Sequence, residues 1–249
     1  MEHLPGGSGG VWRDDDPRFG PLVRRPTGPW TPAVHDLLAH LADGGLDGIP
    51  RVLGTDDDAR EMLTYLPGRT VLVDDEIAAE SVLVGAASWL RRYHDAVRSY
   101  APGPRRWRQT EAALRDGQLI CHNDTGAYNW IIDDDRFVGM IDWDQAGPGM
   151  PLDDLAFLSW TGVPLYRAIG TADAAHRVRA VASAYGGVDA GDLLDAVVDR
   201  MTRAAARIET GIERGDPGMR ALRERGEPER TRARVAGFEW RLPDIRAAL

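Results

Sequence analysis

Short apolar runs of strand length occupy the first part of the chain, whereas helical spacing of apolar residues dominates from residue 153 onward. Polar turns rich in Asp, Gly and Pro separate the early runs, as is usual between strands. Strands are expected at residues 11–13, 22–26, 50–54 and 61–65. One helix is expected between the two pairs, at residues 31–43, because apolar residues recur there every three or four positions and Thr31 can cap the first turn.

The second half of the chain combines one hairpin with several helices. A long helix is expected at residues 75–100, and a hairpin follows at 130–132 and 137–141 around an acidic turn. Later helices are expected at residues 153–160, 172–185 and up to about 214, with a highly charged stretch at 217–249. Either Asp189 or Asp192 caps the helix that ends near residue 214. This order of elements predicts an α+β chain.

The strongest chemical signal lies in residues 121–129, Cys-His-Asn-Asp-Thr-Gly-Ala-Tyr-Asn, followed by Ile-Asp-Trp-Asp at 141–144. Transfer of a phosphoryl group from ATP needs a carboxylate that accepts the proton of the attacking hydroxyl, and oxygen ligands that hold magnesium on the phosphates. Asp124 fits the first role, and Asn129 with Asp142 fits the second.

The hairpin explains why these residues can act together. It brings Asn129, at its start, close to Asp142, just past its end. Two adjacent oxygen ligands, completed by waters and phosphate oxygens, are the usual protein contribution to a magnesium site. An isolated Asp in such a loop is equally typical of turn and capping chemistry. The joint presence of His122, Asp124, Asn129 and Asp142 favours the phosphoryl-transfer interpretation.

Residues 120–165 resemble the aminoglycoside phosphotransferase family of small-molecule kinases. The resemblance rests on the His-x-Asp-x4-Asn segment and on Asp-Gln-Ala-Gly-Pro-Gly-Met-Pro-Leu-Asp-Asp-Leu-Ala at 144–156. It implies a protein-kinase-like fold, with a small β-rich amino lobe at residues 1–68 that covers the nucleotide. It also implies a larger, mainly helical carboxy lobe at residues 69–249, with ATP and Mg²⁺ held between the two.

The resemblance implies a role for each residue of the segment. Asp124 is the catalytic base, and Asn129 and Asp142 are the magnesium ligands. His122 and Asp154 support the site by orienting the catalytic loop.

Other acids could contact the acceptor substrate. Asp144 either helps a metal or a cationic substrate, or is a solvated acid. In the family the last helices form the acceptor pocket, and an acid that reaches it could bind a substrate amino group. Most of the acids on the helix that ends near residue 214 are expected to be solvated; they are Asp195, Asp199, Glu209 and Glu213.

Two parts of the amino lobe are candidates for contact with the nucleotide. Gly7 and Gly9 belong to a glycine-rich run whose backbone N–H groups could cover phosphates, although such a run is also typical of a flexible tail. Thr64 and Leu66 lie at the end of the strand expected at 61–65, where the family's hinge between lobes would bind adenine.

The chain contains no lysine, so all 30 of its basic residues other than histidine are arginine. Kinase-like folds usually place a lysine on the third strand, paired with a glutamate from the following helix. Arg24 and Arg25 point to opposite faces of their strand, and the family pattern favours Arg24 towards the nucleotide and Arg25 outward. The expected helix at 31–43 has no glutamate, and its His35 and Asp36 are weak substitutes.

Composition restricts the class of partner. The net charge of −9 argues against nucleic acid and is compatible with a cationic substrate. A single cysteine allows no internal disulfide and favours a reducing, cytoplasmic location. No run approaches the roughly 20 apolar residues of a membrane span, and no signal peptide is expected. Nothing in the sequence indicates the oligomeric state.

The sequence therefore predicts an ATP-dependent phosphotransferase that moves the γ-phosphate to a hydroxyl of a small molecule, with an aminoglycoside or a related antibiotic as the first candidate. The alternative is a kinase-like binding or immunity protein that sequesters a toxin or antibiotic and turns over weakly. The missing lysine and the missing helix glutamate favour the alternative. Asp124, Asn129 and Asp142 argue against it.

Overall fold

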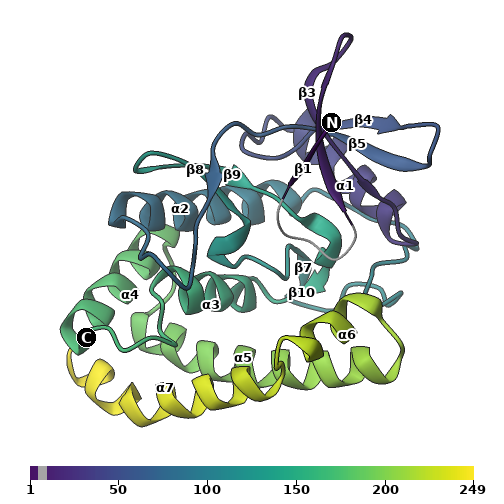
Figure 1. Ribbon diagram of the computed structural model, residues 1–249. Helices are drawn as coiled ribbons and strands as arrows, with labels where there is room; N and C mark the ends of the chain where they lie inside the picture. The colour runs from purple at the N-terminus through teal and green to yellow at the C-terminus, as the bar shows by residue number, and fades with distance from the viewer. Residues whose placement is uncertain (5–9) are drawn as a thin grey trace.

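The structure is a computed structural model that describes residues 1–4 and 10–249 (Figure 1). An antiparallel sheet from the amino-terminal part of the chain lies above a larger, mainly helical part (Figure 1). Its strand order is β1-β2-β3-β5-β4. The strands are β1 (Glu2–Leu4), β2 (Val11–Asp16), β3 (Gly20–Pro26), β4 (Val52–Thr55) and β5 (Arg60–Thr64). The expected α+β class is confirmed, and β2 extends three residues further than expected.

Helix α1 (Thr31–Asp43) lies beside this sheet and buries the expected apolar stripe. Thr31 does not cap the helix. Its hydroxyl oxygen accepts a hydrogen bond from the Gly28 N–H at 2.8 Å, while Trp30 occupies the cap position without a side-chain bond. Pro32 in the first turn, whose missing N–H would have no helical partner, helps to start the helix instead.

The helical part also carries two small sheets. One has the order β6-β8-β9 and the other pairs β10 with β7. The strands are β6 (Arg69–Thr70), β7 (Leu119–Cys121), β8 (Trp130–Asp133), β9 (Arg136–Met140) and β10 (Gly147–Gly149). The helices are α2 (Glu80–Val97), α3 (Pro151–Gly162), α4 (Thr171–Tyr185), α5 (Ala190–Glu213), α6 (Pro217–Glu224) and α7 (Glu229–Ala247). Among the described residues, none of these helices is both long and apolar enough to cross a membrane.

Three sequence expectations are refined here. The helix expected at 75–100 begins only at Glu80, and Ile77, inside the expected range, is 43% exposed. The hairpin of β8 and β9 is confirmed, with Trp130 opposite Met140. Asp189, rather than Asp192, caps α5, because its carboxylate accepts the N–H groups of Gly191 and Asp192.

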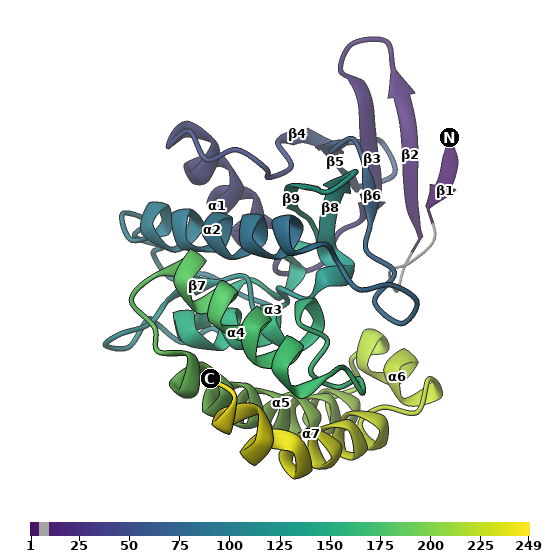
Figure 2. The ribbon, with the colours of Figure 1, turned by 90° about the vertical axis from the view of Figure 1, so that its left-hand side faces the viewer.

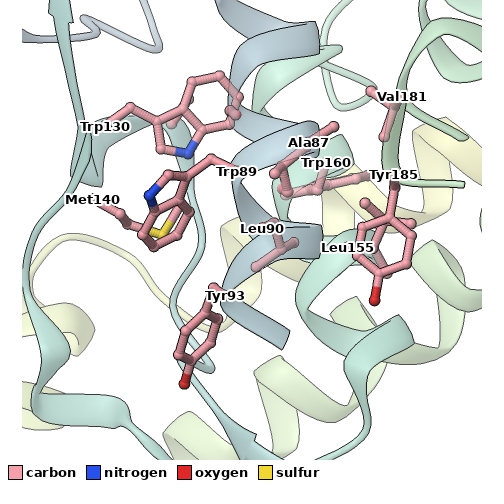
Figure 3. Packing of buried hydrophobic residues seen from close by; sticks show 14 of the residues in the cluster. Ala87, Trp89, Leu90, Tyr93, Trp130, Met140, Leu155, Trp160, Val181 and Tyr185 are labelled. Atoms are coloured by element: carbon pink, nitrogen blue, oxygen red, sulfur yellow. The ribbon is translucent and has the colours of Figure 1, made fainter. Parts of the chain in front are cut away.

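Helix α2 lies in the middle of the core (Figures 2 and 3). On one side Trp89 packs near Trp130 and Met140 of the hairpin, and on the other side Leu155 and Tyr185 come from α3 and α4 (Figure 3). All five side chains are buried. The hairpin that carries the candidate site is therefore anchored in the close-packed core.

The loop after α1 binds closely to this hairpin. The Met140 N–H donates to the Gly48 carbonyl oxygen at 2.9 Å, and the Trp89 indole N–H donates to the Asp47 carbonyl oxygen at 2.7 Å. The two backbones approach so closely that a Cβ added to Gly139 would lie 2.3 Å from the Gly48 oxygen. Glycine at 139 thus permits a direct backbone contact between the two parts of the chain.

We expect Gly139→Ala to destabilise the fold by about 1–3 kcal/mol, because the added methyl group forces the Gly48 loop away from β9. Thermal unfolding followed by circular dichroism would measure the change. Gly103→Ala is the matched control, since no heavy atom lies within 4 Å of its added Cβ and its φ is not positive. Equal melting temperatures for the two variants would contradict the proposed close contact.

Candidate active site

The predicted catalytic loop connects β7 to β8. Strand β7 ends at Cys121, and a short 3-10 helix, Ala127–Asn129, leads directly into β8. Cys121 lies opposite Gly147 of β10, so the chain that follows Asp142 returns to the start of the loop. Asn123 adopts a left-handed backbone conformation with φ 63°. Such conformations in residues other than glycine are uncommon and gather at functional sites.

Asp154 of α3 fixes the backbone of this loop. Its Oδ2 accepts the His122 N–H at 2.8 Å, and its Oδ1 accepts the Asn123 N–H at 2.7 Å. The His94 ring Nε2 lies 3.2 Å from Oδ2, and the Asp154 side chain is fully buried. Burial alone would raise the pKa of Asp154, but the hydrogen bonds and the nearby histidines hold that pKa below its ordinary value.

His122 points into the protein beside the loop. Its ring Nε2 lies 3.1 Å from the Ile141 carbonyl oxygen, and its ring packs against Trp143 with centroids 4.6 Å apart. His122 is fully buried. It therefore links the catalytic loop to the segment that carries Asp142.

Asp124 is held by two side chains that follow it. Its Oδ1 accepts the Tyr128 hydroxyl at 2.5 Å, and its Oδ2 accepts the Asn129 amide Nδ2 at 3.1 Å. The same Nδ2 donates to the Asp124 carbonyl oxygen at 2.9 Å. Burial and the negative charge of Asp142 raise the pKa of Asp124 above its ordinary value. A raised pKa makes this carboxylate a better proton acceptor.

Asn129 and Asp142 lie at the open end of the hairpin, next to each other. The Ile141 N–H donates to the Asn129 carbonyl oxygen at 2.9 Å, which closes that end. Asp142 has φ 62° and ψ 67°, a left-handed conformation that is uncommon in residues other than glycine. Because the Asn129 Nδ2 is directed at Asp124, its amide oxygen remains for another partner. An amide oxygen beside a carboxylate is a donor set that suits Mg²⁺.

Arg25, rather than Arg24, reaches this site. Its Nη1 donates to Asp142 Oδ1 at 3.0 Å, and its Nη2 donates to Asp144 Oδ1 at 2.6 Å. Arg24 lies on the other face of β3, with its guanidinium paired to three acids, which are Asp14, Asp16 and Asp56. The sequence expectation that Arg24 points to the site and Arg25 outward is therefore wrong. The two side chains do point to opposite faces of the strand as predicted, but Arg25 and not Arg24 is the one that faces the site.

The acid that pairs with this arginine comes from a strand and not from a helix. Arg25 lies opposite Glu61 of β5, and its Nε donates to Glu61 Oε1 at 2.5 Å. The His35 ring Nε2, from α1, lies 2.7 Å from Glu61 Oε2. Burial alone would raise the pKa of Glu61, but His35 and Arg25 hold it below its ordinary value. Asp36, the other helix candidate, instead accepts hydrogen bonds from Tyr100 and Arg105.

Asp144 is a paired acid. Besides the contact with Arg25, it lies 3.5 Å from the Arg108 Nη1. Burial raises the pKa of Asp144 above its ordinary value, while the charge of Arg25 acts in the opposite direction. The interpretation of Asp144 as a freely solvated acid is therefore wrong, because arginines contact its carboxylate from both sides.

The expected adenine contacts lie at the end of β5. The Thr64 N–H donates to the Arg51 carbonyl oxygen at 2.9 Å, and the Thr64 hydroxyl oxygen accepts the Arg51 N–H at 2.8 Å. Both groups are thus used within the sheet, and Leu66 follows just after the strand. Gly7 and Gly9 lie outside the described residues, so the expected phosphate contact of the glycine-rich run stays a prediction.

Five residues near the loop were missed by the sequence analysis: Tyr128, Glu61, Arg108, Arg200 and Arg207. Two sequence signals could have indicated some of them. An acid at an inward-facing strand position points to Glu61, and two arginines seven positions apart on one helix point to Arg200 and Arg207. A surface hollow of about 310 Å³ between α1 and α2 is lined by none of the candidate site residues.

An antiparallel sheet with one helix, placed above a helical body that carries an Asp–Asn–Asp hairpin, is the arrangement of the protein-kinase-like phosphotransferases. A model of the phosphotransferase enzyme family matches residues 104–185. The chain is also 35% identical over 182 residues to the trifolitoxin immunity protein of Rhizobium leguminosarum bv. trifolii, covering 68% of this chain and 69% of that protein. The chain belongs to the phosphotransferase enzyme family, which confirms the resemblance to aminoglycoside phosphotransferases.

Solved structures confirm the protein-kinase-like fold. The amicoumacin kinase hAmiN, in complex with AMP-PNP, Ca²⁺ and Ami, superposes with a TM-score of 0.66 at 14% identity, covering 98% of this chain and 87% of that one. A choline/ethanolamine kinase family protein from Mesorhizobium loti gives a TM-score of 0.60 at 19% identity, covering 99% of this chain and 92% of that protein.

Proposed function

We propose that the chain is an ATP-dependent phosphotransferase that moves the γ-phosphate of ATP to a hydroxyl of a small molecule. One observation carries this proposal. Asp124 is held by Tyr128 and Asn129 at one end of the hairpin where Asp142 also lies. These three groups match the requirements for a proton acceptor and two oxygen ligands.

In the reaction the acceptor oxygen forms a bond to the γ-phosphorus, and the bond from that phosphorus to the bridging oxygen breaks. ADP leaves with the electron pair of the broken bond. The hydroxyl proton passes to the Asp124 carboxylate, whose raised pKa supports this transfer, and then to water. Asn129 and Asp142 would hold Mg²⁺, which when bound neutralises charge on the phosphates.

Arg25 takes the place of the usual lysine in this proposal. It is partly buried and oriented by Glu61, so its charge is fixed near Asp142 without a rearrangement of the strand. A guanidinium can bind phosphate through two donors. Adenine contact is expected from the backbone at Leu66, since Thr64 is already bonded to Arg51. Gly7 and Gly9 remain candidates for covering the phosphates.

The similarity to the trifolitoxin immunity protein supports a second candidate function. In that case the chain protects by binding a toxin or an antibiotic, with weak or no phosphoryl transfer. The missing lysine is a weaker argument for this function than the sequence suggested, because Arg25 and Glu61 supply an ion pair beside Asp142. Turnover is what distinguishes the two candidates.

The deciding experiment is phosphate transfer from γ-labelled ATP with magnesium, over a panel of aminoglycosides, other hydroxylated antibiotics and small metabolic alcohols. Label on one compound would support the phosphotransferase. Binding of a panel compound without transfer, while Mg²⁺-dependent nucleotide binding is absent, would favour the sequestering protein. Mg²⁺-dependent nucleotide binding without transfer to any panel compound would direct the search to other acceptor classes.

We expect Asp142→Ala to weaken magnesium-dependent nucleotide binding by more than about tenfold, because loss of even an indirect metal contact commonly costs that much. Titration of ADP with and without Mg²⁺, followed by calorimetry, measures the effect. Asp135→Ala in the exposed hairpin turn is the matched control, with the same loss of charge. If Asp142→Ala kept the affinity of the native chain in Mg²⁺, the metal assignment would be rejected.

A further inference from the structure

One side of α5 presents arginines to the catalytic loop. Arg200, Arg203 and Arg207 are spaced so that they share this side of the helix. The Arg200 Nη2 donates to the carbonyl oxygen of Asn123, the residue before Asp124, at 2.9 Å. The Arg207 Nη2 donates to the Gln145 side-chain oxygen, three residues past Asp142. The side of Asp124 that faces α5 therefore carries positive charge.

Two of these charges have only neutral partners. Arg200 is 7% exposed and stacks on the Phe157 ring, with its Cζ 4.7 Å from the ring centroid. Among residues 1–4 and 10–249, no carboxylate oxygen lies within 4 Å of the guanidinium nitrogens of Arg200 or Arg207. Residues 5–9 contain no acid. Arg203, by contrast, is paired with Asp153.

The unpaired charges act on one another and on the base. Burial and the positive charge of Arg200 lower the pKa of Arg207 to about 10. The charge of Arg207 in turn opposes the rise in the pKa of Asp124. A buried guanidinium without a carboxylate is costly, and a second, partly buried one on the same side of the helix adds to that cost. A bound anion would relieve this cost, and the fork of donors on each arginine suits a carboxylate or a phosphate.

Acids that could bind a cationic acceptor are turned elsewhere. Asp195 pairs with Arg246, and Glu209 pairs with Arg232, both on α7. The other two acids that the sequence suggested on this helix, Asp199 and Glu213, are exposed. A polycation would therefore meet like charge beside Asp124 with no compensating carboxylate from α5.

We infer that the acceptor carries a carboxylate or phosphate group near its reacting hydroxyl, and that Arg200 and Arg207 bind this anionic group beside Asp124. The inference rests on the proposed phosphotransferase function and narrows its substrate class. It favours anionic hydroxyl compounds over aminoglycosides, which are polycations. The arginines act as specificity-determining residues, since they contact the charged group and not the transferred proton.

A matched set of four-carbon alcohols tests this inference. Malate carries two carboxylates, 1,4-diaminobutan-2-ol carries two amines, and butane-1,2,4-triol is neutral. Binding to the chain saturated with Mg²⁺ and AMP-PNP would be measured by ligand-detected NMR. We expect malate to bind at least about tenfold more tightly than the triol, and the diamine to bind no better than the triol. Arg207→Gln and Arg200→Gln should each weaken malate binding by about tenfold.

Arg214→Gln is the control, because this exposed arginine at the end of α5 loses the same charge away from the loop. It should change malate affinity by less than about twofold. The inference is overturned if malate does not bind the native chain at tens of millimolar, if the diamine binds more tightly, or if the two variants match the control. It is also overturned if the variants weaken AMP-PNP rather than malate, which would assign the arginines to the nucleotide. Failure of AMP-PNP itself to bind in Mg²⁺ would instead reject the underlying phosphotransferase proposal.

Discussion

Asp124→Asn is expected to lower turnover by about 10²–10⁴ while nucleotide affinity stays within about twofold. General-base assistance is typically worth this factor, and the substitution keeps the shape of the side chain and leaves Asn129 and Asp142 unchanged. The rate is measured with the acceptor found in the transfer screen, or with water as the acceptor. Asp116→Asn, an exposed acid before β7, loses the same charge and serves as control.

The pH dependence gives a second readout of the same assignment. If Asp124 is the proton acceptor, only its ionised form can act, so the rate should fall as pH drops through a pKa that lies above the ordinary aspartate value of 3.8. The hydrogen bond from Tyr128 lowers this pKa, so Tyr128→Phe should move the acidic limb of the rate profile to higher pH. An Asp124→Asn variant with native turnover, or an acidic limb unaffected by Tyr128→Phe, would remove Asp124 from the mechanism.

Asp154→Asn is expected to cost about 3–5 kcal/mol of stability. Asp154 is fully buried and accepts two backbone N–H groups as well as the His94 contact. An amide can accept with only one of its two terminal atoms, so a buried backbone N–H would face another donor. The buried His94 ring would also lose its carboxylate partner. For a chain of this size the melting temperature should fall by roughly 6–20 °C.

The loss of stability caused by Asp154→Asn should depend on pH in a defined direction. The folded-state pKa of Asp154 lies below its ordinary value of 3.8, so its stabilisation is complete above that pH and is lost as the pH falls towards the folded-state pKa. The difference in melting temperature between the native chain and Asp154→Asn should therefore become smaller below pH 3.8. Asp153→Asn, at the preceding residue on the helix, should change the melting temperature less, because its partner Arg203 is 55% exposed and such ion pairs contribute little. If the difference in melting temperature between the native chain and Asp154→Asn stayed the same above and below pH 3.8, the role assigned to the Asp154 carboxylate would be disproved.

The part of the site that could be predicted from sequence is the part built from neighbouring residues. Asp124, Asn129 and Asp142 lie on one loop and one hairpin, so their spacing along the chain already fixes their proximity. The same holds for most helices and strands, whose apolar periodicity survives in the structure. The helix expected at 75–100 begins five residues late, at Glu80, and Ile77 before it is exposed, so apolar spacing alone did not place the start of the helix.

The cationic part of the site required the three-dimensional structure. Alternation along β3 separates Arg24 from Arg25, but only the register with β5 decides that Arg25 lies opposite Glu61 and faces α1. Arg200 lies 77 positions from Asn123, so no local spacing could connect them. Contacts between distant segments depend on how the elements pack, which is information that the periodicity of one element does not contain.

The position of Arg25 beside Asp142, in a chain without lysine, has a consequence for chemical proteomics. Nucleotide-derived acylating probes detect kinases by transferring a reactive group to the side-chain amine beside the phosphates. These 249 residues contain no such amine, and the carboxylates around Arg25 raise its pKa further, so its guanidinium stays protonated and non-nucleophilic. A survey based on lysine labelling would therefore overlook this chain and any relative that shares the exchange, whatever its activity.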